Sequence, residues 1–426
     1  MFDFAQFSQV DPGATEAELV ARIEALEQLK SAAAAGQARA AAALDTARRA
    51  AESAAGVPAA QRGRGVASEV ALARHDSPAR GGRHLGFAKA LVHEMPHTLA
   101  ALEHGVLSEW RATLIVRESA CLDVEDRRAL DRELCADTTA LHGLGDKRII
   151  AAAKTIAYRR DARAVVERAA KAPQDRTVTI RPAPDTMTWV SILLPVAQGV
   201  GIYAALRRAA DTTVDHRTRG QVMADTAFER LTATPATTPA PIALNVVISD
   251  RALLGGANDA ALLEGYGPIP AEVARTWLNA ALADHHALAT LRRLYANPQT
   301  GALVAMESRA RAFPRALAAF INLRDQTCRT PYCDAPIRHR DHIQPVKHGG
   351  PTTATNGQGL CERCNYTKET PGWTVTAHHH NGHHTTEHQT PTKARYRSTA
   401  PPIYTVTHIS EMEDALGITV IDLHAA

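Results

Sequence analysis

The residues best suited to chemistry in this 426-residue chain lie between positions 328 and 368. Four of the six cysteines fall there as two close pairs with 27 residues between them, Cys328-x4-Cys333 and Cys361-x2-Cys364. Each pair can present two sulfurs to one ion, so the spacing predicts a tetrahedral zinc site that is structural, with no open position for water. Two disulfides or four incidental buried thiols are the alternatives. Cys121 and Cys135 lie far from the pairs and are interpreted as core thiols.

Polar residues between and just after the two cysteine pairs are candidates for hydrolytic chemistry. Asp341 and His342 are adjacent, Asn356 follows a loop, and Asn365 comes directly after the second pair. Adjacent residues on a strand point to opposite faces, so Asp341 and His342 are expected to play different roles. An imidazole with a pKa near its usual value of about 6.5 suits a general base. A carboxylate and a carboxamide suit a hard divalent cation.

A strand–strand–helix unit is expected to position these groups. Residues 338–344 are predicted to form a short strand, 347–356 a loop, 357–360 a second strand and 362–369 a helix. Zinc bound by the cysteines would then clamp the two ends of the segment that carries the carboxylate, the imidazole and the two carboxamides.

Basic charge is concentrated beside this unit. Between positions 309 and 347 there are eight basic and three acidic residues, a local balance of +5. Such a concentration is typical of a polyanion partner, and a solvated charged face is the alternative. The candidate phosphate contacts are Arg338, Arg340, Lys347 and Lys368.

The set of Asp341-His342, Asn356 and Asn365, bracketed by the cysteine pairs, resembles an HNH endonuclease of the ββα-metal fold. This motif covers about 50 residues. More loosely, most of residues 10–325 is similar to the actinobacterial 13E12-repeat proteins, in which a domain of unknown function precedes the nuclease. The segments that carry this second resemblance are Leu99–Ser108, Gly265–Pro270 and Arg324-Asp325.

The resemblance implies a role for each residue of the motif. His342 would be the general base that takes a proton from the attacking water. Asp341 and Asn365 would bind one Mg²⁺ or Mn²⁺, and Asn356 would hold the loop and orient the imidazole. The implied activity is metal-dependent hydrolysis of phosphodiester bonds in DNA. The alternative is a zinc-stabilised nucleic-acid-binding protein without cleavage activity, which would be free to lose any of these residues.

Two positions depart from the pattern of many relatives. Asn365 stands where many carry a histidine, which shifts the metal preference. The run Arg338-His339-Arg340 stands where an acidic residue is common, and these side chains are expected to contact phosphate instead. His339 is also a second candidate for the imidazole nearer the substrate.

Composition limits the class of protein. A hydrophobic content of 45%, a charged content of 22% and a net charge of +3 exclude wholesale disorder and polytopic membrane architecture. Residues 186–206 are uncharged, but they contain Pro195 and two glycines and are interpreted as a buried strand that turns into a helix. The N-terminus is no secretory signal, and the expectation is a cytoplasmic protein without membrane contact.

The expected fold class is α+β, with a mostly helical N-terminal region, a few strands, and then the small zinc-braced ββα nuclease domain. Residues 15–55 are predicted to be one long helix that begins with a capping box at Thr15 and Glu18. Its alanine-rich second half favours a helical pair or a homodimer seam, with a solvated spacer as the alternative. Residues 61–83 are interpreted as a loop.

Three domains are expected along the chain. Residues 1–300 form a helix-rich domain, with a possible sub-boundary near residue 172 and a linker at 232–241. Residues 301–376 form the nuclease domain. Residues 377–426 form a C-terminal extension that contains a histidine-rich hairpin.

Overall fold

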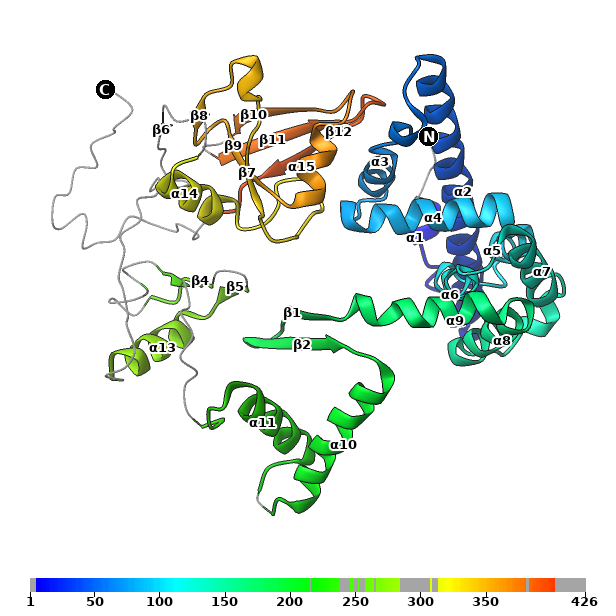
Figure 1. The fold of residues 1–426 in the computed structure, drawn as a ribbon, viewed down its shortest axis with the longest axis horizontal. Coiled ribbons are helices and arrows are strands. Elements are labelled where there is room, and N and C mark those ends of the chain that lie inside the picture. Colours follow the sequence, from blue (N-terminus) through cyan, green and yellow to red (C-terminus); the bar gives the residue numbers. More distant parts are fainter. Residues whose placement is uncertain are drawn as a thin grey trace. The chain divides into compact units, whose positions relative to one another are not determined.

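The structure is a computed structural model, and its elements are labelled in Figure 1. It describes the following residues: 5–214, 216–237, 246–248, 252, 257–263, 266–283, 307–308, 313–380 and 383–402. The chain divides into two compact units, Met1–Ala172 and Pro173–Ala426. Within the described ranges the first unit is helical and all the strands lie in the second, which confirms the predicted α+β class.

The first unit is organised around one long helix. After the short α1 (Ala5–Ser8), α2 runs over Glu16–Ala54 and begins with the capping box at Thr15 and Glu18. Its alanine-rich half packs against α4 (Pro78–Glu94) and α5 (Pro96–Glu103). The buried alanines of α2 are Ala34, Ala35, Ala38, Ala41 and Ala42. This face is therefore covered within one chain, and it lends no support to the predicted homodimer.

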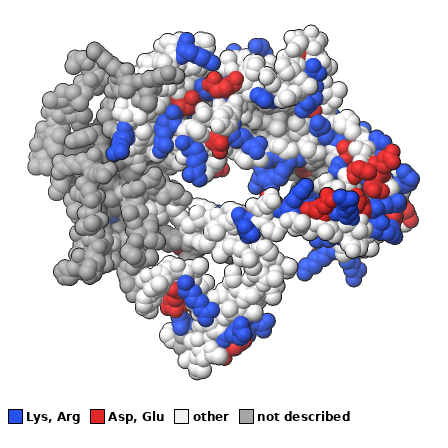
Figure 2. Space-filling view, in the orientation of Figure 1, with Lys and Arg blue, Asp and Glu red and all other residues white. Residues whose placement is uncertain are grey.

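The remaining helices close a single apolar core. They are α3 (Val66–Ala73), α6 (Glu109–Ser119), α7 (Val124–Cys135), α8 (Asp146–Arg160) and α9 (Ala162–Lys171). The largest fully buried side chains of this core are Leu91, Met95, Leu102, Leu107, Leu114, Ile115, Leu130 and Ile149, together with Leu72 of α3. On the face seen in Figure 2, basic and acidic side chains are interspersed over this unit.

The prediction of a loop over 61–83 was wrong. This segment contains α3 and the first residues of α4. Six of the eight residues of α3 are buried, among them Val66, Val70 and Leu72, and this burial outweighs the glycines and arginines around the helix. Pro78 occupies the first turn of α4, where the missing N–H costs no hydrogen bond.

The second unit begins with an antiparallel hairpin, β1 (Thr177–Ala183) with β2 (Met187–Leu193), followed by α10 (Val196–Thr212) and α11 (Arg219–Thr232). The strand-then-helix order expected for 186–206 is present, but the expected burial was wrong. All seven residues of β2 are exposed, with Trp189 at 57%, and β1 is the only strand paired with β2 in the described chain. None of the described helices combines the length and the apolar character that a membrane crossing requires.

A small sheet and a helix follow. The strands β3 (Val246–Val247), β4 (Ala261–Leu263) and β5 (Gly267–Ile269) pair in sequence order, and α13 (Ala271–Ala283) begins directly after Pro270. Of the predicted linker 232–241, residues 238–241 lie outside the described residues.

The last part of the second unit, which we call the C-terminal module (residues 313–402 with β6), contains the candidate site. Its elements are β6 (Glu307–Ser308), α14 (Arg315–Asp325), β7 (His339–His342), β8 (Thr352–Thr353), β9 (Gly357–Leu360), α15 (Glu362–Lys368), β10 (Thr374–His380), β11 (His383–Gln389) and β12 (Arg395–Thr399). β7 pairs with β9, β6 with β8, and β10, β11 and β12 form an antiparallel sheet. The strand–strand–helix unit β7–β9–α15 thus occupies the stretch where the sequence predicts it.

Candidate active site and metal centre

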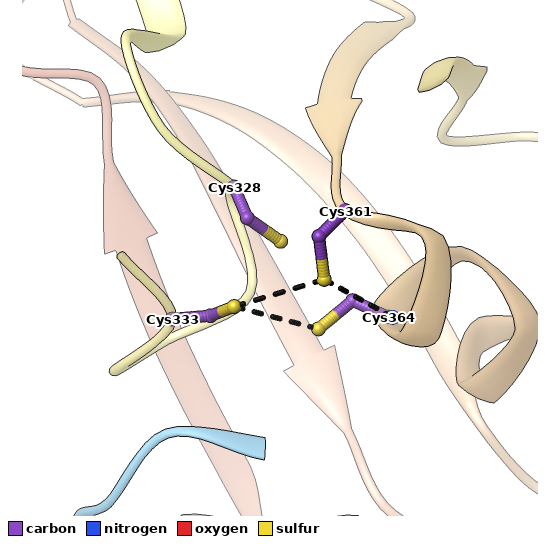
Figure 3. Close-up of side chains that lie close together, drawn as sticks. All are labelled: Cys328, Cys333, Cys361 and Cys364. Atoms are coloured by element: carbon purple, nitrogen blue, oxygen red, sulfur yellow. Dashed lines mark hydrogen bonds between the residues drawn. The ribbon is translucent and has the colours of Figure 1, made fainter. Parts of the chain in front are cut away.

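The four cysteines of the two pairs converge on one point (Figure 3). Their sulfur atoms all lie within 4.8 Å of one another, with Cys333 Sγ 3.9 Å from Cys361 Sγ and 3.7 Å from Cys364 Sγ. Four sulfurs about 2.3 Å from a central zinc would lie roughly 3.8 Å apart, whereas a disulfide joins its sulfurs at about 2.05 Å. The geometry therefore fits a metal ion such as zinc and excludes the two disulfides.

Local backbone structure presents these sulfurs. Cys328 and Cys333 lie on the loop after α14, where the Cys328 N–H donates to Ala335 O at 2.9 Å. Cys361 is the N-cap of α15, and its sulfur accepts from the Cys364 backbone N–H at 3.5 Å. Hydrogen bonds from the thiols of Cys328, Cys333 and Cys364 hold the pKa of Cys361 well below its usual range. A thiolate, the form that binds metal, is thus favoured at the start of α15.

A buried ion pair fixes α14 to the site. Arg324 and Asp325, which are 6% and 1% exposed, make a bidentate pair at 2.7 and 3.0 Å. Arg324 also donates to Gly357 O at 2.7 Å, and the Gly359 N–H donates to Asp325 Oδ2 at 2.7 Å. These bonds attach α14 to β9, whose ladder with β7 then sets the positions of Asp341 and His342.

His342 is held on two sides. Its ring lies against Phe313, with centroids 4.4 Å apart, and its Nε2 is 2.9 Å from Thr352 Oγ1. No residue in the described ranges bonds to Nδ1. Burial lowers the pKa of His342, an effect that Asp341 opposes and Lys368 reinforces. The neutral form of the imidazole is therefore favoured, and its Nδ1 can accept a proton in the tautomer whose Nε2–H donates to Thr352 Oγ1.

Asp341 points to different partners from those of its neighbour. Its Oδ2 accepts a hydrogen bond from Gln358 Nε2 at 3.2 Å and pairs with Lys368 Nζ at 3.0 Å. Gln358 is its cross-strand partner on β9, and Lys368 comes from α15. The separate partners of Asp341 and His342 agree with the alternation expected for adjacent strand residues.

Asn365 contributes an oxygen without a partner. It lies on α15, which packs against β7, and its Oδ1 is shielded from solvent but accepts no hydrogen bond from any described residue. A buried carbonyl oxygen left in this state costs free energy unless something binds it. A carboxamide oxygen is among the ligand types that hard divalent cations such as Mg²⁺ accept.

Asn356 closes the loop between β7 and β9. Its Oδ1 accepts from the Gln344 N–H at 2.8 Å, and its Nδ2 donates to Gln344 O at 3.1 Å and to Pro351 O at 2.8 Å. A Cβ on Gly350 would lie 1.8 Å from Gln344 O, so only glycine allows this closure. Asn356 therefore holds the chain just after His342 and makes no hydrogen bond to the ring itself.

The four basic residues predicted to meet phosphate occupy two kinds of environment. Arg338 and Arg340 are exposed and alternate along the chain with His342, which places them on its face of the strand. The Lys347 side chain is 67% exposed and lies 3.6 Å from Glu369. The Lys368 side chain is only 6% exposed.

Sequence reasoning missed three side chains that touch the site, namely Phe313, Thr352 and Gln358. Gln358 could have been predicted from the sequence, because pairing the two predicted strands in the correct register places it opposite Asp341. Thr352 and Phe313 reach His342 through tertiary packing and leave no local signal. Within the described residues, the four cysteines are the only set of histidine, cysteine or acidic side chains that could hold a metal ion.

Comparison with known families agrees with this geometry. The model of the HNH endonuclease family matches residues 328–370, which include all four cysteines and Asp341, His342, Asn356 and Asn365. The model of a domain of unknown function, DUF222, matches residues 23–325. The predicted order, a domain of unknown function followed by an HNH domain, is confirmed. No curated protein and no solved structure matches the chain.

Proposed function

This chain belongs to the DUF222 family and carries an HNH endonuclease domain at its residues 328–370, and on that premise we propose that it is a metal-dependent endonuclease that hydrolyses phosphodiester bonds in DNA. The observation that carries the proposal is the arrangement around β7. A neutral imidazole with an open Nδ1 is adjacent in the chain to a carboxylate, and α15 packs beside them with a buried carboxamide oxygen that lacks a partner.

His342 acts as the general base. Its Nδ1 takes a proton from water while the water oxygen attacks phosphorus, and the bond from phosphorus to the 3′ oxygen breaks. Thr352 and Phe313 hold the ring, so little reorientation is needed at the moment of proton transfer. Asn356 is a positioning residue that fixes the chain next to His342.

Two metal ions are part of the proposal. Asp341 and Asn365 would hold Mg²⁺ or Mn²⁺, which when bound stabilises negative charge on the scissile phosphate and the departing oxygen. Cys328, Cys333, Cys361 and Cys364 would hold a structural Zn²⁺, with four protein ligands and no open position.

Arg338, Arg340 and Lys347 would contact backbone phosphates. The two arginines share the strand face of the proposed base, and all three side chains are exposed. Contacts of this kind position a duplex without reading its sequence, so they would add affinity and salt dependence to binding.

Cleavage of supercoiled plasmid with Mg²⁺ or Mn²⁺ tests the proposal. We expect His342→Ala to lower the rate by roughly 10² to 10⁴-fold, which is the usual contribution of a general base. His339→Ala is the matched control, because it removes an imidazole from the same strand but from the opposite face. It should cut within a few-fold of wild type.

The outcomes separate the candidate functions. Plasmid that is bound but left uncut by the zinc-loaded wild type would favour the rival, a zinc-stabilised nucleic-acid-binding protein. A His342→Ala variant as fast as wild type would refute the role of His342 as general base. Loss of cutting in His339→Ala alone would reassign the base.

A further inference from the structure

Lys368 contacts two carboxylates and a backbone carbonyl next to the candidate active site. Its Nζ is 3.0 Å from Asp341 Oδ2 and 3.1 Å from Glu369 Oε1, and it donates to His342 O at 2.9 Å. The side chain is 6% exposed, and lysine is seldom buried this far unless its charge is paired. Its ammonium therefore serves as a counterion at the carboxylate.

The lysine shares α15 with Asn365, whose buried Oδ1 has no hydrogen-bond partner among the described residues. Asn365 and Lys368 are three residues apart on α15, a spacing that puts side chains on one side of a helix. The buried Asn365 Oδ1 accepts nothing from Lys368 or from any other described residue. The ammonium thus neutralises one of the two proposed oxygen ligands and leaves the other open.

We propose that Lys368 is a built-in competitor of the catalytic cation, which neutralises Asp341 in the metal-free protein and must release this carboxylate when the cation binds. This inference rests on the proposed function, since it takes Asp341 as a metal ligand. A divalent cation and an ammonium on one carboxylate repel each other strongly at such short distances. Lys368 therefore weakens cation binding in the absence of DNA, and a substrate phosphate is the anion that can take over its charge.

The test measures Mn²⁺ binding to the full, zinc-loaded chain without DNA, from the electron paramagnetic resonance signal of free Mn²⁺. Lys368→Met and Lys368→Gln remove the competing charge and should lower the Kd for Mn²⁺ at least tenfold. Lys368→Arg keeps the charge and should stay within about twofold of wild type. Lys347→Met is the matched control, because it removes an exposed lysine that also pairs with Glu369, and its Kd should not change. Asp341→Asn should abolish the tight binding and so locate it.

An unchanged or higher Kd in the two neutral variants would overturn the proposal. Each variant is also checked for one bound zinc per chain. If both neutral variants lose zinc while Lys368→Arg keeps it, Lys368 is a structural ion-pair residue and the proposal is likewise overturned. Because no DNA is present, the titration is independent of cleavage. If wild type cuts plasmid but the neutral Lys368 variants leave the Kd for Mn²⁺ unchanged, only this inference is refuted. If the Kd for Mn²⁺ falls in these variants but wild type cuts nothing, only the nuclease activity is refuted.

Discussion

The helical unit and the C-terminal module are held together by different physical means. The helical unit buries one continuous apolar cluster that runs through α2 to α8. Among its described residues, the module has two small apolar clusters, one around Leu317 and Ile321 and the other formed by the cysteines with Leu360. Many of its other buried residues are polar, among them Arg324, Asp325 and His388.

This difference indicates which interactions each region can lose. Each buried Leu or Ile side chain stabilises the fold by about 1.5–3 kcal/mol, and these contributions add up over many side chains. The loss of one of them therefore leaves most of the stability in place. A buried charge stabilises only while its partner is present, because removing one partner leaves the other desolvated and unpaired. A core this small also needs an additional source of folding free energy, which a bound metal ion can supply. We therefore expect the module to depend on a few essential contacts and the helical unit on many replaceable ones.

Zinc removal gives the largest expected effect. Chelation, or Cys361→Ser, should unfold the module and leave the helical unit intact, because structural zinc sites supply on the order of 10 kcal/mol of folding free energy. Amide hydrogen exchange measures this, with protection lost in β7, β9 and β11 and kept in α4–α8. Cys135→Ala, in the helical core, is the control and should leave the module protected. A module that stays protected without metal would contradict the comparison.

A core truncation tests the opposite region. Leu102→Ala should lower the free energy of unfolding of the helical unit by roughly 2–5 kcal/mol, because Leu102 is fully buried and the cavity cannot close completely. Urea unfolding followed by circular dichroism measures the change. Val20→Ala, on the exposed side of α2, should cost less than about 0.5 kcal/mol. Equal destabilisation of the module by Leu102→Ala would show that the two regions unfold as one.

Acid should weaken the module more than the helical unit. Burial lowers the pKa of His384 to about 4 and that of His388 to about 3. A histidine in the unfolded chain titrates near pH 6.5, so below that pH protons bind the unfolded state preferentially. The module therefore has its full free energy of unfolding above about pH 6.5 and loses part of it as the pH falls toward 4, by about 3 kcal/mol for His384. Urea midpoints at about pH 7 and pH 5 measure the loss.

A histidine replacement separates this effect from acid release of zinc. His384→Gln keeps a donor for Thr355 O, which His384 Nε2 contacts at 2.9 Å, but it does not titrate. The variant should therefore lose less stability between the two pH values than wild type. An identical loss in both proteins would assign the acid sensitivity to the zinc site instead.

The smallest expected effect concerns a helix cap. Thr15→Ala removes the side chain that accepts from the Glu18 N–H at the start of α2, at a cost of roughly 1 kcal/mol. The cost should be local, because this end of α2 is exposed, and hydrogen exchange should speed up only over the first turns. A change in the module would contradict the independence of the two regions.

Local features were readable from the sequence because they depend on neighbouring residues. The capping box at Thr15 and Glu18 and the short helix predicted over 362–369 each follow from one or two turns of backbone. The loop prediction for residues 61–83 was wrong because the helix there depends on contacts with residues outside the segment. Its composition is that of a loop, and α3 forms there because most of its residues are buried by packing against α4 and its neighbours.

The amino-acid sequence by itself determined which groups are available for chemistry, namely two cysteine pairs and an Asp-His pair followed by two asparagines. Only the tertiary structure decided that the four sulfurs share a centre, that Thr352 and Phe313 hold His342, and that Lys368 turns inward to Asp341. The physical reason is sequence separation. Such contacts depend on strand register and helix packing, which the Arg324-Asp325 pair sets from a distant part of the chain.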